Sequence, residues 1–332
     1  MFIPKDHVNV VVVGPFQSGK STFLGHLFVD LKQVDQRTID RYKRDCIEFL
    51  KPNCEYAYVF EKTKIEHEIG LTNIQATKGI FAKDILHPKE ELCNSEIQQV
   101  SIKKYEKMNV SFIDTPGRKK YIKNAIRGIH KGDVAFLVIC ASLNFEDQKE
   151  SIIENLIPLK IFLVELVAVI VTKMGEVKYS EVCFEETKQK IIELMKIIGL
   201  STESVRFVPI DGLEGDNLTV YSDKMAWTVN KYGTVVDLLN TLIIPERNQL
   251  DTQPFGMTIE NICKIRNVGT VLVGIVESGV VHANQIVTVS PSGLSVKTKS
   301  VETMGNPILE GKGRVLVGVN VVGATDFDYK IG

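Results

Sequence analysis

Short apolar runs alternate with amphipathic stretches through the first 245 residues. Between the runs lie helical patterns, one of which, Ser180–Ile198, begins at a polar cap and stops before Gly199. Strands that alternate with helices predict an α/β domain whose mostly parallel sheet is flanked by helices. Five runs rich in Val, Ile, Leu and Phe predict strands buried on both faces: Val8–Val13, Val110–Ile113, Val134–Ala141, Leu166–Thr172 and Arg206–Ile210.

The pattern changes after Pro245. The stretch 246–254 is polar and ends in Pro254, which indicates a linker. Beyond it, short alternating runs separated by Gly, Asn and Pro predict a small antiparallel β-barrel. We therefore expect two domains, at 1–245 and at 255–332. The runs are Met257–Ile262, Thr270–Glu277, Gln285–Ser290, Ser295–Glu302 and Arg314–Val322.

Composition narrows the class of protein. The 332 residues include 40 Lys+Arg and 41 Asp+Glu, a net charge of −1 that argues against a dedicated nucleic-acid-binding protein. The six cysteines are scattered without a C-x-x-C pair, which is typical of reduced cytosolic thiols. The longest apolar stretch, 161–172, contains Glu165 and is too short to cross a bilayer. We expect a cytoplasmic protein with no membrane segment.

The most specific motif is Gly14-Pro15-Phe16-Gln17-Ser18-Gly19-Lys20-Ser21, which fits G-x-x-x-x-G-K-[ST]. It follows the first predicted strand and opens the helical stretch Thr22–Leu31. In such a loop backbone N–H groups surround a phosphate, Lys20 contacts the β- and γ-phosphates, and the Ser21 hydroxyl binds Mg²⁺. A glycine turn that fits by chance is the structural alternative, and the order of strand, loop and helix argues against it.

A second motif, Asp114-Thr115-Pro116-Gly117, follows the apolar run 110–113. An aspartate at this strand end can hold Mg²⁺ through water, and the Gly117 N–H can reach a γ-phosphate. Alone, such a sequence would be an ordinary turn. Together with the phosphate loop, it favours a magnesium–nucleotide site.

Collinear segments along nearly the whole chain resemble the translational GTPases of the eukaryotic elongation factor 1-alpha type. They include HVNVVVVGPFQSGKSTFLGHL, EYAYVFEKTKIEHEIGLT, DTPGRKKYIKNAIRG, VTKMG, PIDGLEGDNL and GTVLVGIVESGV. The resemblance implies a GTP-binding domain followed by β-barrels, with GTP or GDP and Mg²⁺ as ligands. It further implies a monomer that works with the ribosome, aminoacyl-tRNA and a nucleotide exchange factor, and that hydrolyses GTP during decoding.

The same resemblance assigns site residues by position. Thr72, in Gly70-Leu71-Thr72, matches the first-switch threonine, so the implied metal ligands are Ser21, Thr72 and Asp114. The implied nucleotide contacts are Gly14, Gln17, Ser18, Gly19, Lys20, Ser21, Thr22, Gly117, Thr172, Lys173, Asp211 and Gly212.

One departure from the family concerns hydrolysis. Arg118 stands where the family has the histidine that positions the attacking water. A guanidinium has five donors and no acceptor, so it cannot accept a proton from water, and such a loss lowers rates by about 10²–10⁴. Arg118 could instead contact phosphate oxygens and favour tight binding. We expect impaired hydrolysis that Arg118→His would raise.

A second departure concerns the base. The family motif N-K-x-D is Thr172-Lys173-Met174-Gly175 here, so the carboxylate that accepts from guanine is missing. We expect about ten- to a hundredfold weaker GTP binding, and we expect Gly175→Asp to raise the preference for guanine. Asp211 or Glu176 could supply a substitute carboxylate, although both are also consistent with solvated surface acids.

Two further differences are a polar insertion over 83–107 and an end at Gly332, where we expect no counterpart of the family's third domain. The sequence thus predicts a GTP-binding, elongation-factor-like protein of translation. The alternative is a nucleotide-binding pseudo-GTPase that regulates or binds the translation machinery. A folded relic without function and an unrelated P-loop ATPase or kinase are the remaining interpretations.

Overall fold

The computed structural model describes residues 6–61, 76–80, 108–242, 248–303, 306–323 and 329–331. Thr72 and the insertion 83–107 lie outside these described residues. The chain divides into two compact units, Val8–Ile243 and a second that joins Ile244–Gly332 with Met1–His7.

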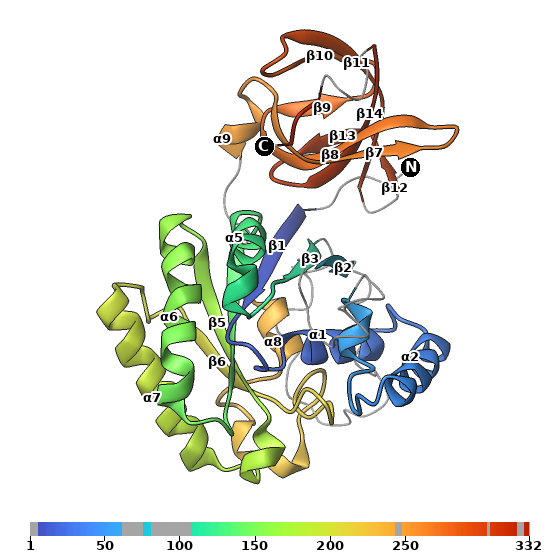
Figure 1. Ribbon diagram of the computed structural model, residues 1–332. Coiled ribbons are helices and arrows are strands. Elements are labelled where there is room, and N and C mark those ends of the chain that lie inside the picture. The colour runs from blue at the N-terminus through green and yellow to red at the C-terminus, as the bar shows by residue number, and fades with distance from the viewer. Residues whose placement is uncertain are drawn as a thin grey trace, which may run out of the picture. The chain divides into compact units, whose positions relative to one another are not determined.

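The Val8–Ile243 unit is built on a six-stranded sheet in the order β2-β3-β1-β4-β5-β6 (Figure 1). Strands β1, β4, β5 and β6 pair in parallel, whereas β2 is antiparallel to β3. The prediction of a mostly parallel sheet is confirmed, and all five predicted strands lie within two residues of their expected bounds. The strands are β1 Asp6–Val13, β2 Ala76–Ile80, β3 Met108–Asp114, β4 Val134–Cys140, β5 Glu165–Thr172 and β6 Arg206–Pro209.

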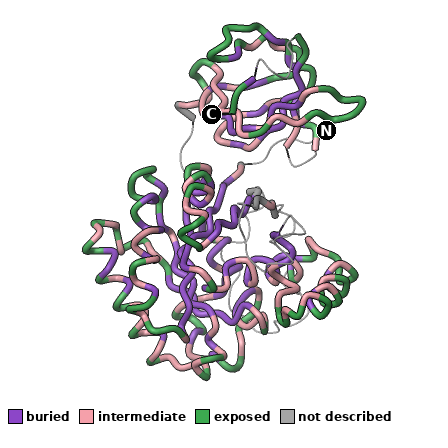
Figure 2. Tube along the Cα trace, in the orientation of Figure 1, coloured by how far each residue is buried: buried purple, intermediate pink, exposed green. Residues whose placement is uncertain are grey.

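Helices cover both faces of this sheet. Along β1, Val10 and Val12 enter one core together with side chains of α1 and α8, whereas Val11 and Val13 enter a second core with α6 and α7. The uninterrupted apolar runs therefore belong to strands without a solvent face, and Figure 2 draws them as buried. The helices are α1 Lys20–Asp30, α2 Gln36–Glu48, α5 Ile122–His130, α6 Phe145–Ile161, α7 Glu181–Ile198 and α8 Val235–Asn240, with 3₁₀ turns at Ala57–Val59, Lys119–Tyr121, Met174–Val177 and Asp223–Thr228.

Helix ends follow local side-chain chemistry. Helix α7 begins after Ser180, whose hydroxyl accepts a hydrogen bond from the Cys183 N–H, and it ends at Gly199 in the left-handed region, as predicted. Ile191, Leu194 and Met195 of this helix are buried against the sheet core, whereas Ile197 is 80% exposed. Helix α1 begins at Lys20, two residues earlier than predicted, because the phosphate loop leads directly into it.

The second unit consists of antiparallel sheets that form a half-barrel, which confirms the predicted strand class. One sheet has the order β10-β11-β14-β8-β7 with β12 beside β11, and β13 pairs with β9. A short helix, α9 Asn248–Asp251, lies in the stretch predicted as a linker. The strands are β7 Gly256–Ile265, β8 Gly269–Ser278, β9 Val280–His282, β10 Ile286–Val289, β11 Leu294–Thr303, β12 Asn306–Ile308, β13 Glu310–Lys312 and β14 Leu316–Val322.

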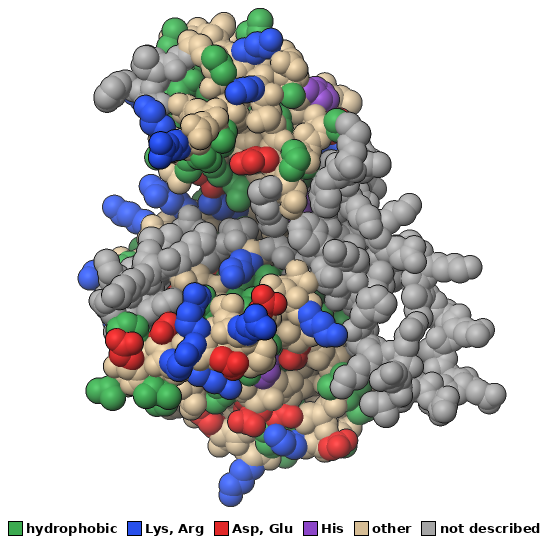
Figure 3. All heavy atoms as spheres, turned by 90° about the vertical axis from the view of Figure 1, so that its right-hand side faces the viewer, with side chains coloured by type: hydrophobic (Ala, Val, Ile, Leu, Met, Phe, Trp, Pro, Cys, Tyr) green, Lys and Arg blue, Asp and Glu red, His purple; other side chains and the backbone are tan. Residues whose placement is uncertain are grey.

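Surface charge is mixed in sign. On the face of the Val8–Ile243 unit drawn in Figure 3, Lys and Arg side chains lie among Asp and Glu side chains. This mixture agrees with the net charge of −1. Within the described residues, every helix falls short of the length and apolar character needed to cross a bilayer.

Candidate nucleotide-binding site

The phosphate loop connects the carboxyl end of β1 to the first turn of α1. Gly14 packs so closely on β4 that a Cβ there would lie 2.1 Å from the Val138 carbonyl oxygen. Gln17 and Gly19 have φ of 60° and 86°, and Gly19 is the N-cap of α1. Left-handed residues alternating with others turn successive N–H groups to one side, and the helix N-terminus adds positive potential. The loop therefore has two features expected of an anion-binding nest, left-handed residues and a helix N-terminus directly after them.

The Lys20 side chain extends from the first turn of α1 back to the start of this loop. Its Nζ donates to the carbonyl oxygens of Gly14 at 2.9 Å and Pro15 at 2.8 Å. Burial lowers the pKa of Lys20 to about 8, and the nearby Asp114 carboxylate opposes that shift. A Cβ on Gly117 would lie 2.7 Å from Nζ, so the ammonium stands between the phosphate loop and the second motif.

Oxygen ligands suited to Mg²⁺ meet beside the loop. Ser21 Oγ donates to Asp114 Oδ2 at 2.5 Å, and Thr115 Oγ1 donates to the Val12 carbonyl at 2.7 Å, which fixes the second motif on β1. No group of three or more His, Cys, Asp or Glu that could hold a metal occurs among the described residues. A site with one carboxylate and a hydroxyl fits Mg²⁺, because this ion is usually held by one or two carboxylates together with phosphate and water oxygens.

Thr172 joins the end of β5 to the phosphate loop. The residue is 1% exposed, and its Oγ1 lies 2.6 Å from the Ser18 carbonyl oxygen and 3.1 Å from that of Ile139. The hydroxyl carries a single proton, which it donates to the nearer Ser18 oxygen. The sequence marked Thr172 as a departure from the family's asparagine, and the structure shows that a side chain at this position braces the loop.

Arg118 lies against the phosphate loop through an aromatic contact. Its Cζ is 4.1 Å from the ring centroid of Phe16, a cation–π geometry, and its backbone is extended. Both residues line a cleft of about 400 Å³ that extends to Gln148 and Ser151 of α6. Phe16 was not among the predicted site residues. The signal for it was that Gly14-Pro15-Phe16-Gln17 stands where the resembled family has G-H-V-D beside the reacting phosphate, so this segment departs from the family as Arg118 does.

The loop after β5 and the loop after β6 meet beside α1. Thr172 and Lys173 open one of them, with Lys173 at φ 60°, and Asp211 and Gly212 open the other after β6. His26 Nδ1 lies 2.9 Å from the Gly212 carbonyl oxygen and donates to it, which clips the second loop onto α1. The remaining predicted contact, Thr22, is half-buried in the first turn of the same helix.

Asp211 occupies the space that a residue larger than glycine would need at position 175. Asp211 Oδ2 accepts from the Gly175 N–H at 2.9 Å, and a Cβ on Gly175 would lie 2.7 Å from that oxygen. The expectation that Gly175→Asp alone improves guanine preference is therefore revised, because the new side chain would collide with a fixed carboxylate.

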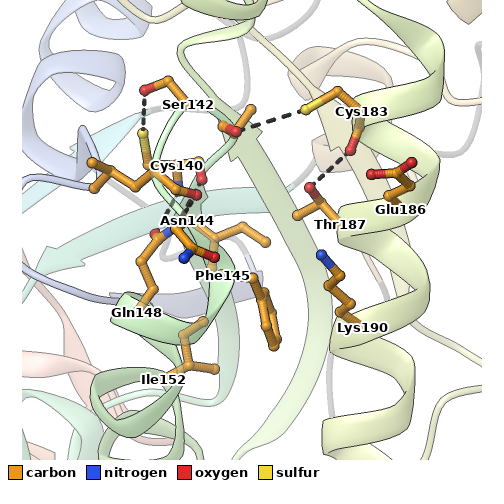
Figure 4. Close-up of a pocket in the computed structure, with 13 residues that line it drawn as sticks. Cys140, Ser142, Asn144, Phe145, Gln148, Ile152, Cys183, Glu186, Thr187 and Lys190 are labelled. Carbon is orange, nitrogen blue, oxygen red and sulfur yellow. Dashed lines mark hydrogen bonds between the residues drawn. The ribbon is translucent and has the colours of Figure 1, made fainter.

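A separate pocket of about 240 Å³ lies between α6, α7 and the end of β4 (Figure 4). The Gln148 side chain accepts the Cys140 N–H and donates to the Cys140 and Leu143 carbonyl oxygens. These bonds fix α6 to the segment after β4 on one side of the pocket. Cys183 Sγ contacts the Ala141 carbonyl at 3.7 Å, and burial raises the pKa of its thiol. These contacts stabilise the turn after β4, and the nucleotide motifs lie outside the pocket.

Comparisons with known proteins agree with this geometry. Residues 5–249 match the sequence model of the elongation factor Tu GTP binding domain. Elongation factor 1-alpha of Plasmodium falciparum is 33% identical over 334 residues, which cover 99% of this chain and 69% of that protein. Elongation factor 1-alpha of Entamoeba histolytica is 32% identical, with the same two coverages.

Solved structures share the fold. The S. cerevisiae Ski7 GTPase-like domain bound to GTP superposes with a TM-score of 0.74 and 18% identity, over 97% of this chain and 72% of that chain. A bacterial selenocysteine-specific elongation factor gives a TM-score of 0.68 and 18% identity, over 98% of this chain and 44% of that chain. At this identity the likeness concerns the fold alone.

Proposed function

The chain belongs to the elongation factor Tu GTP-binding domain family, and from this premise we propose that it binds GTP with Mg²⁺ through the loop 14–21 and hydrolyses it slowly. It is a GTP-binding, translation elongation factor-like protein.

The observation that carries the proposal is the buried Lys20 ammonium inside the phosphate loop. Its Nζ donates to the Gly14 and Pro15 carbonyl oxygens, which hold the charge within the loop, and the Thr172 hydroxyl braces the same loop from β5. A buried positive charge at the N-terminus of a helix is complementary to the β- and γ-phosphates. We assign phosphate contacts to Gly14, Gln17, Ser18, Gly19, Lys20 and Thr22, and to the Gly117 N–H.

The metal ligands in this proposal are the Ser21 hydroxyl and, directly or through water, the Asp114 carboxylate, with Thr72 as a further ligand implied by the family. The 2.5 Å contact between Ser21 and Asp114 supports it, because two hard oxygens already converge there. When bound, Mg²⁺ neutralises phosphate charge.

Slow hydrolysis rests on Arg118. Its guanidinium lacks an acceptor for a proton of water, and the stack on Phe16 holds it at the mouth of the phosphate loop. A group that only donates can contact phosphate oxygens and stabilise bound nucleotide without activating water. We expect the rate of phosphate release to lie about 10²–10⁴ below that of a site with a positioned base.

The relatives suggest where such a protein acts. Both curated relatives are named elongation factor 1-alpha. We therefore propose the cytoplasm as its location and the ribosome, aminoacyl-tRNA or a nucleotide exchange factor as partners. This chain spans 69% of the length of those relatives, so these partners are proposed for the protein as a whole.

The test combines binding and turnover. Calorimetry with GTP and GDP in the presence of Mg²⁺ measures affinity, and phosphate release with and without ribosomes measures hydrolysis. We expect micromolar or tighter binding that Lys20→Met abolishes and that Lys196→Met, at an exposed position in the last turn of α7, leaves unchanged. Equal binding by wild type and Lys20→Met would refute the assignment of the loop.

A second candidate is a nucleotide-binding regulator that does not hydrolyse GTP. The Arg118–Phe16 stack favours it, because the guanidinium occupies the place of the water-positioning group. Phosphate release that ribosomes stimulate supports the first candidate, and tight binding without release under either condition supports the second.

A further inference from the structure

The loop after β5 lacks the carboxylate that guanine recognition in this family uses, and its neighbour does not replace it. Glu176 is exposed, accepts a hydrogen bond from Ser142 Oγ and lies 3.6 Å from Lys173 Nζ. These contacts hold it at the end of β4 and at the surface. Of the two substitute carboxylates that the sequence left open, Glu176 and Asp211, the structure therefore favours Asp211.

Asp211 approaches position 175 from the other loop. It is 7% exposed and lies 36 residues further along the chain, yet its Oδ2 accepts the Gly175 N–H at 2.9 Å. Because a Cβ on residue 175 would lie 2.7 Å from that oxygen, an aspartate at 211 and any side chain at 175 compete for the same space. A side chain at 175 would therefore displace the Asp211 carboxylate from its present position.

The Asp211 carboxylate is fixed and has capacity for another donor. Its Oδ1 accepts the N–H groups of Leu213 at 3.1 Å and Glu214 at 3.2 Å, an ordinary turn contact. Its Oδ2 accepts the Gly175 N–H, and a carboxylate oxygen can accept two hydrogen bonds. The hydrogen bonds to Oδ1 are those of an ordinary turn. The hydrogen bond to Oδ2 comes from a separate loop, so it places a carboxylate oxygen beside residue 175.

We propose that Asp211 is the residue that recognises guanine, with its carboxylate reaching the base from the loop after β6 while Gly175 keeps the space open. This proposal rests on the proposed GTP binding. Guanine presents the N1–H and the N2 amine as donors to a carboxylate, whereas adenine presents an unprotonated N1 that repels it. Asp211 is thus a specificity-determining residue in place of the one missing at 175.

The first experiment measures base preference. Equilibrium binding of GTP, ATP and xanthosine triphosphate is compared for wild type, Asp211→Asn and the control Asp237→Asn. Asp237 is a matched control because its carboxylate also accepts a backbone N–H, that of Thr234 in the capping box of α8. We expect wild type to prefer GTP at least about tenfold, as a charged hydrogen bond allows.

In Asp211→Asn the amide replaces an acceptor by a donor, which suits the O2 carbonyl of xanthine and not the N2 amine of guanine. We expect the ratio of GTP to xanthosine triphosphate affinity to fall at least about tenfold, and Asp237→Asn to keep the wild-type ratio. A loss of packing alone would weaken all three nucleotides together. An unchanged ratio in folded Asp211→Asn overturns the proposal.

The second experiment moves the carboxylate between loops. Gly175→Asp alone places two carboxylates in one space, so we expect weaker GTP binding than in wild type. Gly175→Asp with Asp211→Ser leaves one carboxylate there, and we expect GTP preference to return towards the wild-type value. This pair tests the idea even if Asp211→Asn does not fold, and tighter GTP binding by Gly175→Asp alone overturns it.

The proposal and the proposed function fail in different ways. If wild type binds none of the three triphosphates, GTP binding itself is refuted. If it binds all three with equal affinity, the phosphate site stands and base recognition by Asp211 is overturned.

Discussion

Thr172→Val removes one buried hydroxyl at the junction of β5 and the phosphate loop. Valine has nearly the shape of threonine, so the change deletes a hydrogen bond without opening a cavity. The Ser18 carbonyl loses the donor that lies 2.6 Å away. An unsatisfied buried acceptor costs about 1–3 kcal/mol, and we expect the free energy of unfolding to fall by that amount.

Part of this loss should appear in nucleotide binding. Ser18 and Lys20 belong to the same loop, and without the brace the loop must be ordered again when phosphate binds. A penalty of about 1 kcal/mol corresponds to about fivefold weaker affinity, since 1.4 kcal/mol is tenfold. Calorimetric titration of GTP with Mg²⁺ measures this change, and urea unfolding measures the stability.

The control is Thr228→Val. Thr228 is as buried as Thr172, and its Oγ1 donates to the Met225 carbonyl at 2.8 Å, away from the loop. We expect a similar loss of stability with unchanged GTP affinity. If both variants lose stability and both keep wild-type affinity, then Thr172 only supports the fold and the bracing argument is wrong.

Three other predictions address hydrolysis, the metal and pH. Arg118→His should raise the rate of phosphate release at least about tenfold, whereas Lys120→His on the same segment should not; equal rates in both variants would contradict the role given to residue 118. EDTA should weaken GTP binding by wild type, and this response, measured by calorimetry, should be smaller in Ser21→Ala; the same response in both would remove Ser21 from the metal site. Burial raises the pKa of the Asp216 carboxyl, but hydrogen bonds from Lys224 and two hydroxyl groups outweigh burial and hold it below its ordinary value. Its stabilising contribution is therefore present above about pH 4 and lost as the pH falls through the folded-state pKa, so the stability difference between wild type and Asp216→Asn in urea unfolding should shrink in acid.

The sequence predicted those parts of the fold that depend on local pattern. Strands β1, β4 and β5 are long apolar runs, and such runs follow directly from burial on both faces. Strand β2 was missed because Ala76–Ile80 contains a lysine and a glycine and has too few apolar residues to signal an edge strand. The three-residue strands β9, β12 and β13 are too short to show a period of two.

For the candidate site, too, local sequence motifs could be predicted and contacts between distant residues could not. The phosphate loop is contiguous, so its motif predicted a turn between β1 and α1, which the structure contains, although α1 begins two residues earlier than predicted. The contact between Gly175 and Asp211 joins two loops 36 residues apart, and the stack of Arg118 on Phe16 joins two motifs. Each substitution alone indicates a lost function, and only the three-dimensional arrangement reveals its partner.

Helix α1 sets a distance within the candidate site. Lys20 lies at the start of α1, and six residues later His26 clips the Gly212 loop to the same helix. At 1.5 Å per residue, these two anchor points are separated by about 9 Å along the helix axis. Fewer than two turns of helix therefore set the distance between the phosphate loop and the loop after β6, and this distance does not depend on which loop carries the carboxylate.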